Sequence, residues 1–487
     1  MSGTIAAAPS RRVFVVLVAW VLFSGALFFP EVSRGADNAV RTLTLDDALS
    51  IASERNRDIG KALEFRKQVE GRYVEERSAA LPQVVVTSSF SRDRDESQKA
   101  FGGGFIPLER EIRSAEAGLS QPLYTWGQIG AGLRAARIGF ATADDRLRFY
   151  RQSAARDVTA SFYDILLARE LNAIALQNLE QKVNHLDEAR KKHAAGTATD
   201  YDVLAAEVAA ENARPDAIRT ENLVRTSRER FRFLLAIEGG EVDASGNLLS
   251  AVDPYPGYEE TLDTAVRKRP ELSELRHRIA ISRELVTVAN AGDKPRLDFR
   301  GGFGWRYLDV GSNDADGKVW SAGLFFSFPI FDGSRTRGRV AQARSEAASL
   351  RIDEAKLLDA IALEARDVVN AVREAGEIVK ALSGTVSQAE RLLSMAGKGF
   401  EYGVKTRLDV VDAELNLTQA RGILARARRD YLVTRVNLEY VKGTLGEEGP
   451  AAKAPEKLWQ PAESIPGIFM EILEFQPRLN REDNAGK

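Results

Sequence analysis

The sequence contains one short stretch twice, and each copy lies between two runs of helical character. Residues 196–207 and 403–414 align without a gap. Their identical positions are Gly196 and Gly403, Thr199 and Thr406, Asp202 and Asp409, Val203 and Val410, Ala206 and Ala413, and Glu207 and Glu414. Glycine readily adopts the left-handed conformation that ends a helix, and threonine can cap the next helix. Each copy is therefore predicted to be a tight turn between two helices, and both turns are expected at the same end of the molecule.

The runs before these turns predict two unusually long helices. Residues 127–194 and 333–401 contain no proline and few glycines. At ~1.5 Å rise per residue, each helix would reach roughly 100 Å. Apolar and small residues recur in them at spacings of three and four, which favours coiled-coil packing. Shorter helices are expected after the turns, over about 199–237, with Pro215 as a kink, and over about 406–445.

Two further helices are predicted ahead of the long ones, over about 57–81 and 271–290. The shorter helices that follow the turns cannot retrace the whole length of their long partners. The leading helices are therefore expected to stack end to end on them. Each chain would then contain two long and two composite helices, all roughly parallel to one axis.

Between the leading and the long helices, the hydrophobic period changes from helical to two. Strands are predicted at about 83–95 and 111–124 in the first half, and at about 296–310 and 318–331 in the second. The polar segment 311–317 is expected to be the loop of the second hairpin.

One face of the second hairpin is predicted to carry large apolar groups, whereas the other face carries charges and glycines. The apolar face consists of Phe299, Phe303, Trp305, Tyr307, Trp320, Leu324 and Phe326, and Phe325 breaks the alternation. In a soluble sandwich such a face would lie in a core, but in an outer-membrane barrel it would face lipid. Four strands cannot close a barrel, because the smallest have about eight. If the strands span a membrane, several chains must share one barrel.

Composition excludes several classes of function. The chain of 487 residues has no cysteine, so disulfides and thiolate metal sites are excluded. Its formal net charge of −2 gives no basic field for nucleic acid. Its three histidines show no metal-ligand spacing, and His185 and His193 are interpreted as solvated side chains of a charged helix. Without a phosphate loop, a nucleophile motif or a ligand cluster, we expect no enzyme activity, no cofactor and no metal.

The sequence divides into four parts. Residues 1–36 are predicted to be a signal peptide, since two arginines precede an apolar run and small residues follow it. Removal is favoured over a retained anchor, and the mature chain would lie beyond the inner membrane. Residues 37–240 and 241–446 would form the first and second helix–hairpin–helix repeats. Residues 447–487 would form a C-terminal tail that is partly disordered.

Several of these motifs resemble the TolC family of outer-membrane efflux proteins, over nearly the whole mature chain. They are the duplicated unit, residues 118–124 (Gly-Leu-Ser-Gln-Pro-Leu-Tyr) before Gly127, residues 400–403 (Phe-Glu-Tyr-Gly) with Thr406, Asp409, Val410 and Asp412, and residues 443–446 (Gly-Thr-Leu-Gly). The resemblance implies an α+β membrane protein and a homotrimer. A long α-helical coiled-coil barrel would be continuous with a transmembrane β-barrel to which each chain gives four strands. The chain would lie in the outer membrane, in contact with its lipid, and extend into the periplasm.

The resemblance also implies a function and partners. The trimer would be the passive exit duct of a tripartite efflux or type I secretion system. The duct would open by docking to a periplasmic adaptor (membrane fusion) protein and to an inner-membrane pump of RND or ABC type. By position, Gly196, Thr197, Gly403 and Val404 would contact the adaptor. The alternative from another class is a structural periplasmic coiled-coil protein without a pore.

By the same resemblance, Asp409 and Asp412 match acidic residues that line the narrowest constriction of the pore, and Asp202 is the weaker equivalent in the first turn. Lys405 matches a basic gate residue, and Phe400 stands where a well-studied member has a tyrosine. Rings of carboxylates around one axis would favour cations and raise each other's pKa. The residues alone leave a second interpretation of Asp409, a carboxylate near the N-terminus of a helix, where the helix dipole favours it.

Overall fold

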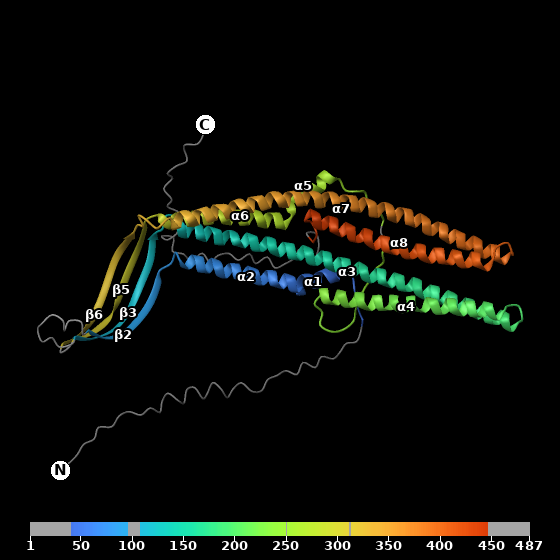
Figure 1. Cartoon of the computed structure of the whole chain (residues 1–487), viewed down its shortest axis with the longest axis horizontal. Helices are drawn as coiled ribbons and strands as arrows, with labels where there is room; N and C mark the ends of the chain where they lie inside the picture. The colour runs from blue at the N-terminus through green and yellow to red at the C-terminus, as the bar shows by residue number, and fades with distance from the viewer. Residues whose placement is uncertain (1–39, 96–107, 250, 311–312, 447–487) are drawn as a thin grey trace, which may run out of the picture.

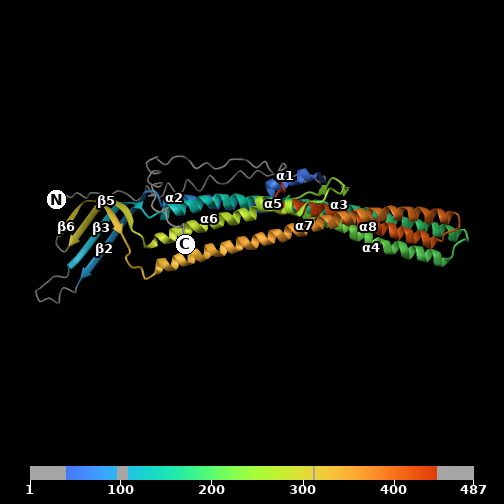
Figure 2. The same ribbon diagram turned by 90° about the horizontal axis from the view of Figure 1, so that it is seen from above.

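The long axis of the molecule separates a β-sheet at one end from two helical turns at the other (Figures 1 and 2). The computed structural model describes residues 40–95, 108–249, 251–310 and 313–446. The signal peptide expected at 1–36 and the tail expected at 447–487 lie outside the described residues. Each half of the chain runs from the middle of the molecule to the sheet, then along the whole length to a turn, and then back to the middle.

The two halves have the same order of elements. The first half contains β1 (Arg41–Leu43), α1 (Leu45–Arg55), α2 (Arg57–Ser78), β2 (Gln83–Asp95), β3 (Leu108–Tyr124), α3 (Gln128–Ala194) and α4 (Asp200–Leu234). The second half contains β4 (Val242–Ala244), α5 (Tyr258–Lys268), α6 (Pro270–Asn290), the 3-10 helix η2 (Ala291–Asp293), β5 (Arg296–Val310), β6 (Asn313–Ser327), α7 (Arg335–Glu401) and α8 (Arg407–Lys442).

The long helices α3 and α7 each have 67 residues. Alanine and aliphatic residues at helical spacing form the buried stripe of each, which lets neighbouring helices approach closely. Pro215 lies inside α4, and the helix continues through it. None of the helices in the described part of the chain combines the length and the apolar character that crossing a membrane requires.

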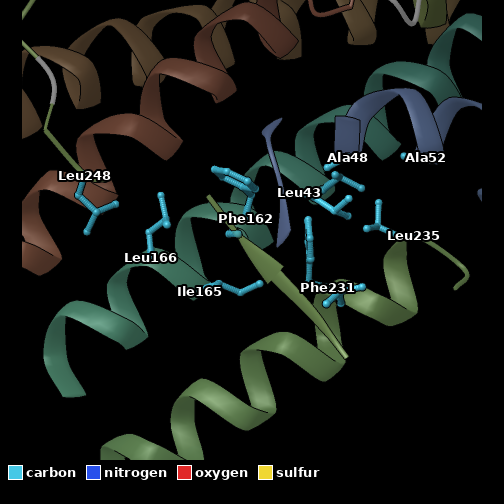
Figure 3. Packing of buried hydrophobic residues seen from close by; sticks show 12 residues of the cluster. Leu43, Ala48, Ala52, Phe162, Ile165, Leu166, Phe231, Leu235 and Leu248 are labelled. Carbon is cyan, nitrogen blue, oxygen red and sulfur yellow. The ribbon is translucent and has the colours of Figure 1, made fainter. Parts of the chain in front are cut away.

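The best-developed apolar core lies midway along the molecule, where the parallel pair β1–β4 is covered by α1, α3 and α4 (Figure 3). Phe162 of α3 and Phe231 of α4 meet there with their ring centroids 6.0 Å apart. Ala48 of α1 and Leu235 at the end of α4 are fully buried beside them. This core joins the end of the first half to its beginning, because β4, which follows α4 in the chain, pairs with β1.

The leading helix α2 meets the end of α4 at this level. The side chain of Asn56 caps α2 by accepting hydrogen bonds from the backbone N–H groups of Asp58 and Ile59. Its Nδ2 group donates to the carbonyl oxygen of Leu234 at 3.2 Å. One amide therefore satisfies the orphan donors of one helix and an orphan acceptor of the other. This contact joins α4 and α2 as one composite helix.

In the second half, α8 ends against the junction of α5 and α6. Gly443 ends α8 with a φ of 72°. A Cβ atom on Gly443 would lie 2.9 Å from the backbone of Lys268 and Arg269, so the two segments are in close contact. Gln152 of α3 donates to the Gly443 carbonyl oxygen at 2.7 Å and ties this junction to the first half.

The four long strands form one antiparallel sheet in the order β2-β3-β5-β6. The prediction for β6, residues 318–331 after a loop at 311–317, was wrong at both ends. The strand begins at Asn313, because the backbone ladder continues through polar residues and pairs Asp309 with Asp314. It ends at Ser327, two residues before Pro329, which has no N–H group to donate to a ladder. In the first hairpin, β3 begins at Leu108, three residues before the predicted start.

Candidate functional site

Both turns at the far end of the molecule have the same backbone geometry. Gly196 and Gly403 adopt left-handed conformations, with φ of 74° and 72°. The N–H of Thr197 donates to the carbonyl of Lys192, and that of Val404 to the carbonyl of Gly399, both at 2.8 Å. These bonds satisfy the last carbonyl groups of α3 and α7. An L-residue with a side chain would be strained at either glycine, which explains why both copies of the motif start with glycine.

The helices that follow begin with matching capping boxes. Thr199 and Asp202 exchange hydrogen bonds at the start of α4, and Thr406 and Asp409 do so at the start of α8. In the second turn, Asp409 Oδ2 accepts from the Thr406 backbone N–H at 2.8 Å and from its hydroxyl at 2.7 Å. The other oxygen of Asp409 accepts from Lys405 Nζ at 3.2 Å. Within one chain, Asp409 is therefore a capping residue, and the expected gate residue Lys405 is its ion-pair partner.

These contacts set the pKa of Asp409 in the direction opposite to that expected for a ring of like charges. Hydrogen bonds from the Thr406 side chain and backbone, followed by the one from Lys405, lower this pKa from 3.8 to about 2. Hydrogen bonds from the Thr199 backbone and hydroxyl likewise lower the pKa of Asp202. Asp412, one turn further along α8, is exposed. Asp412 therefore takes no part in the capping box of this turn.

The pH dependence of the second turn follows from the lowered pKa of Asp409. Capping favours the charged carboxylate, so it stabilises the turn fully above pH 3.8 and progressively less as the pH falls through about 2. We expect amide hydrogen exchange at Thr406 and Asp409 to lose protection between about pH 4 and pH 2. Asp409→Asn should remove this pH dependence, and protection that stays constant across the range in the unmodified protein would contradict the capping role.

A polar cluster behind the turns links α3 to α8, and the partners on the two helices are more than 200 residues apart in the sequence. Glu414, whose side chain is only 9% exposed, accepts from His185 Nε2 at 3.0 Å and from Lys182 Nζ at 3.2 Å. Arg407 hydrogen-bonds His185 Nδ1 and also Glu188, at 3.0 Å. Since arginine can only donate, His185 Nδ1 accepts and its Nε2–H group donates to Glu414. The interpretation of His185 as a solvated side chain was therefore wrong.

Some of the predicted tip residues line one cavity of about 460 Å³ between the two helical hairpins. They are Thr197 in the first turn, Asp202 on α4 and Phe400 on α7. The Phe400 ring lies 5.9 Å from the Arg407 guanidinium, which also lines the cavity. Gly196, Gly403, Val404, Lys405, Asp409 and Asp412 do not line it. Periodicity could not reveal the Arg407–His185 contact, but Glu414 among the buried Ala413 and Leu417 is a polar break in an apolar stripe.

At the opposite end, the predicted apolar residues of β5 and β6 share one face of the sheet. Phe303 pairs with Trp320, Phe299 with Leu324, and Leu297 with Phe326. Trp305 and Tyr307 follow on the same face, with their rings stacked 6.3 Å apart between centroids. Trp320 is 76% exposed and Phe326 is 69% exposed in the single chain. An apolar face this large and this exposed requires a covering partner.

The profile of the family described as "Outer membrane efflux protein" matches residues 48–236 and 261–444, which is most of the chain and includes both halves. The chain belongs to this family. The outer membrane protein TolC of Vibrio cholerae serotype O1 is 23% identical over 76% of this chain and 84% of that protein. The alkaline protease secretion protein AprF of Pseudomonas aeruginosa is 25% identical over 76% of this chain and 78% of that protein.

Solved structures have the same fold. The CmeC outer membrane channel of Campylobacter jejuni superposes with a TM-score of 0.72 at 17% identity, over 84% of this chain and 88% of that one. The resemblance to TolC-like proteins is thus confirmed, and the protein is an outer-membrane efflux or secretion channel that extends into the periplasm. Membership of a family of channels fits the expectation that the chain is not an enzyme, and it disfavours the alternative of a coiled-coil protein without a pore.

Proposed function

We propose that three copies of this chain form one passive exit duct. A periplasmic adaptor and an inner-membrane pump would open it at its periplasmic end. The observation that carries the proposal is the four-stranded sheet with one exposed aromatic face and two open edges. Within the described residues, β2 and β6 each pair with a neighbour on one side only. They run in opposite directions, so β6 of one copy can pair antiparallel with β2 of the next. Three copies would give a closed barrel of 3 × 4, or twelve, strands, above the minimum of about eight.

The dimensions of the aromatic face fit a bilayer. Leu297 and Tyr307 are ten residues apart on β5, or roughly 33 Å at ~3.3 Å per residue. A strand tilt of about 40° reduces this to about 25 Å, the usual height of the apolar band of such barrels. A charged row ends the band, since Arg92, Glu111, Asp309 and Asp314 are paired across the four strands. Lipid is therefore the proposed partner of this face.

The helical part would continue this barrel as a tunnel. Two long helices and two composite helices per chain give twelve in a trimer, all roughly parallel to the axis. Both turns would then lie at the periplasmic entrance, about as far from the barrel as the long helices reach. The tunnel needs no energy source of its own, so transport would be driven by the pump.

We assign adaptor docking to the turns, at Gly196, Thr197, Gly403 and Val404. The side chain of Val404 is 78% exposed, and its backbone bond leaves that side chain free. Exposed apolar residues continue from the turns onto the helices, with Tyr201 and Leu204 on α4 and Leu408 on α8. Such a surface suits apolar side chains of partner helices.

We assign the constriction to Asp409 and Asp412, with Asp202 in a lesser role, and the gate to Phe400 and Lys405. Because the cap occupies Asp409, Asp412 is the acid that can meet its copies around the axis most freely. A ring of carboxylates there would favour cations. The relatives include proteins named for alkaline protease secretion and for cobalt-zinc-cadmium resistance, so the proposal commits to the duct and to a pump of RND or ABC type but to no single cargo.

Conductance of the purified protein tests the duct and its constriction together. The mature protein is expected to form trimers in detergent and to conduct cations in preference to anions across planar bilayers. Asp412→Asn should weaken this preference, because it removes three of the proposed ring charges from each trimer. Asp200→Asn, the same change at the other turn, is the matched control and should leave selectivity unchanged. Unaltered selectivity of the Asp412 variant would exclude it from the constriction, and a protein that stays monomeric would exclude the duct.

A further inference from the structure

The polar face of the sheet contains a hollow that none of the functions above uses. It is an open hollow with a volume of about 670 Å³, and it lies on the side of the sheet opposite Phe303 and Trp320. Its base is formed by Gly118 and Gly323, which have no side chain on this face, and by the backbone of Gly301 between them. Arg300, Phe325 and Glu116 form its walls. A floor of glycines with charged and aromatic walls is the shape of a binding site rather than of a uniform barrel lining.

Phe325 is the residue that breaks the alternation of β6, and it is the aromatic wall of this hollow. Its ring lies against Gly323, where a Cβ atom would be 3.4 Å from the ring, so the absence of a side chain at Gly323 leaves space for it. The ring is still 48% exposed on a face that is otherwise polar. Exposed aromatic surface on such a face is unfavourable unless something covers it.

Arg300 provides a charge beside this ring. Its guanidinium carbon lies 5.0 Å from the ring centroid of Phe325, within cation–π range. In the described part of the chain, Arg300 has no carboxylate within salt-bridge distance, whereas Arg296 on the same strand binds Asp298 at 2.9 Å. The guanidinium of Arg300 therefore keeps donors available for an incoming acceptor.

Glu116 closes the other side, and Gly302 leaves room for it. A Cβ atom on Gly302 would collide with Glu116 Oε1 and would lie 3.1 Å from Ser321 Oγ. The carboxylate thus lies over the glycine, about two residues along β5 from Arg300. A negative wall at this distance restricts the anionic end of any ligand to the Arg300 side of the hollow.

We propose that this hollow binds planar aromatic carboxylates in transit, with Phe325 stacking on the ring and Arg300 pairing with the carboxylate. The inference rests on the proposed duct, because the polar face is then the face towards the lumen. A flat aromatic ring of the ligand can stack on Phe325 and cover its exposed surface, and a carboxylate can accept two parallel hydrogen bonds from a guanidinium. The hollow would hold such molecules at the level of the barrel, above the tunnel.

Binding of 1-naphthoate to the full-length protein in detergent tests the site, by saturation-transfer NMR titration. Naphthoate should bind more tightly than cyclohexanecarboxylate, which has the charge without the aromatic ring. Arg300→Gln should weaken naphthoate binding by about five- to tenfold. Phe325→Leu should weaken it by about threefold. Arg306→Gln makes the same charge change on the same face of β5, where the chain offers no aromatic partner among the described residues, and should leave binding unchanged.

Equal naphthoate affinity in the unmodified, Arg300→Gln and Phe325→Leu proteins would overturn the proposal, as would equal affinity for the two carboxylates. If Phe325→Leu does not assemble, the exposed Arg300→Gln variant decides alone. Conductance of the same preparations tests the duct separately. If the protein forms a conducting trimer but both variants bind naphthoate as tightly as the unmodified protein, the binding site is rejected and the duct is kept. If the protein does not conduct but naphthoate binding depends on Arg300, the duct is rejected and the binding site is kept.

Discussion

Trp320→Arg is expected to prevent the chain from assembling in the outer membrane. Trp320 lies in the middle of β6, pairs with Phe303, and is exposed on the aromatic face. An arginine facing lipid near the bilayer midplane costs about 2–4 kcal/mol, which corresponds to roughly a thirtyfold or larger loss for each chain. Three chains in one barrel multiply the penalty. Heat-resistant trimers in the outer-membrane fraction, measured by gel electrophoresis and immunoblotting, should fall below detection.

Ser321→Arg is the matched control for this experiment. Ser321 is the next residue along β6 and therefore projects from the opposite face of the same strand. If that face borders an aqueous lumen, the same new charge at the same depth should leave trimers near their normal level. Equal loss of trimers in both variants would show that the two faces have equivalent surroundings, and the assignment of lipid to the aromatic face would then be wrong.

Val404→Glu is expected to abolish capture of the periplasmic adaptor while trimers and their conductance persist. The Val404 side chain is exposed at the second turn, so the substitution should not disturb packing within the chain. A carboxylate there would have to be desolvated against the apolar surface of a docked partner, at a cost of several kcal/mol. Adaptor recovered by crosslinking in intact cells and co-purification should therefore fall at least tenfold.

Val404→Thr separates the effect of charge from that of shape in this test. Threonine has nearly the shape of valine but adds one hydroxyl group, so capture should be reduced only slightly. If the Val404→Glu variant captures as much adaptor as the unmodified protein, the assignment of adaptor docking to this turn is wrong. Loss of capture by both variants, with normal trimers, would indicate that the adaptor needs the apolar side chain itself.

The local features of the fold could be read from the sequence because they depend on neighbouring residues. The left-handed glycines, the threonine caps and the 67-residue helices follow from spacing and from the distribution of glycine and proline. The error at β6 has the opposite cause. Asp314 and Asp316 are polar residues typical of loops, yet their backbone groups continue the ladder, and Asp316 accepts a hydrogen bond from Trp305 Nε1 at 3.0 Å.

The contacts between distant segments could not be predicted in the same way. His185, Arg407 and Glu414 lie on α3 and α8, and no periodicity in either helix indicates which residue of the other it meets. The two interpretations of Asp409 also have different origins. Its cap is a local property that the chain fixes by itself, whereas a ring of carboxylates depends on copies around an axis and so on the assembly.

The joint between α4 and α2 has a mechanical consequence. In the described part of the chain, the side-chain amide of Asn56 bonds to the end of α4, and no helical backbone runs from α4 into α2. The composite helix is therefore interrupted midway along the molecule, whereas α3 is continuous there. Bending at that height breaks no hydrogen bond within a helix, so it costs less there than in the continuous helix α3. If the entrance of the proposed duct widens, bending at this level would move the lower part of the composite helix while the segment next to the sheet stays in place.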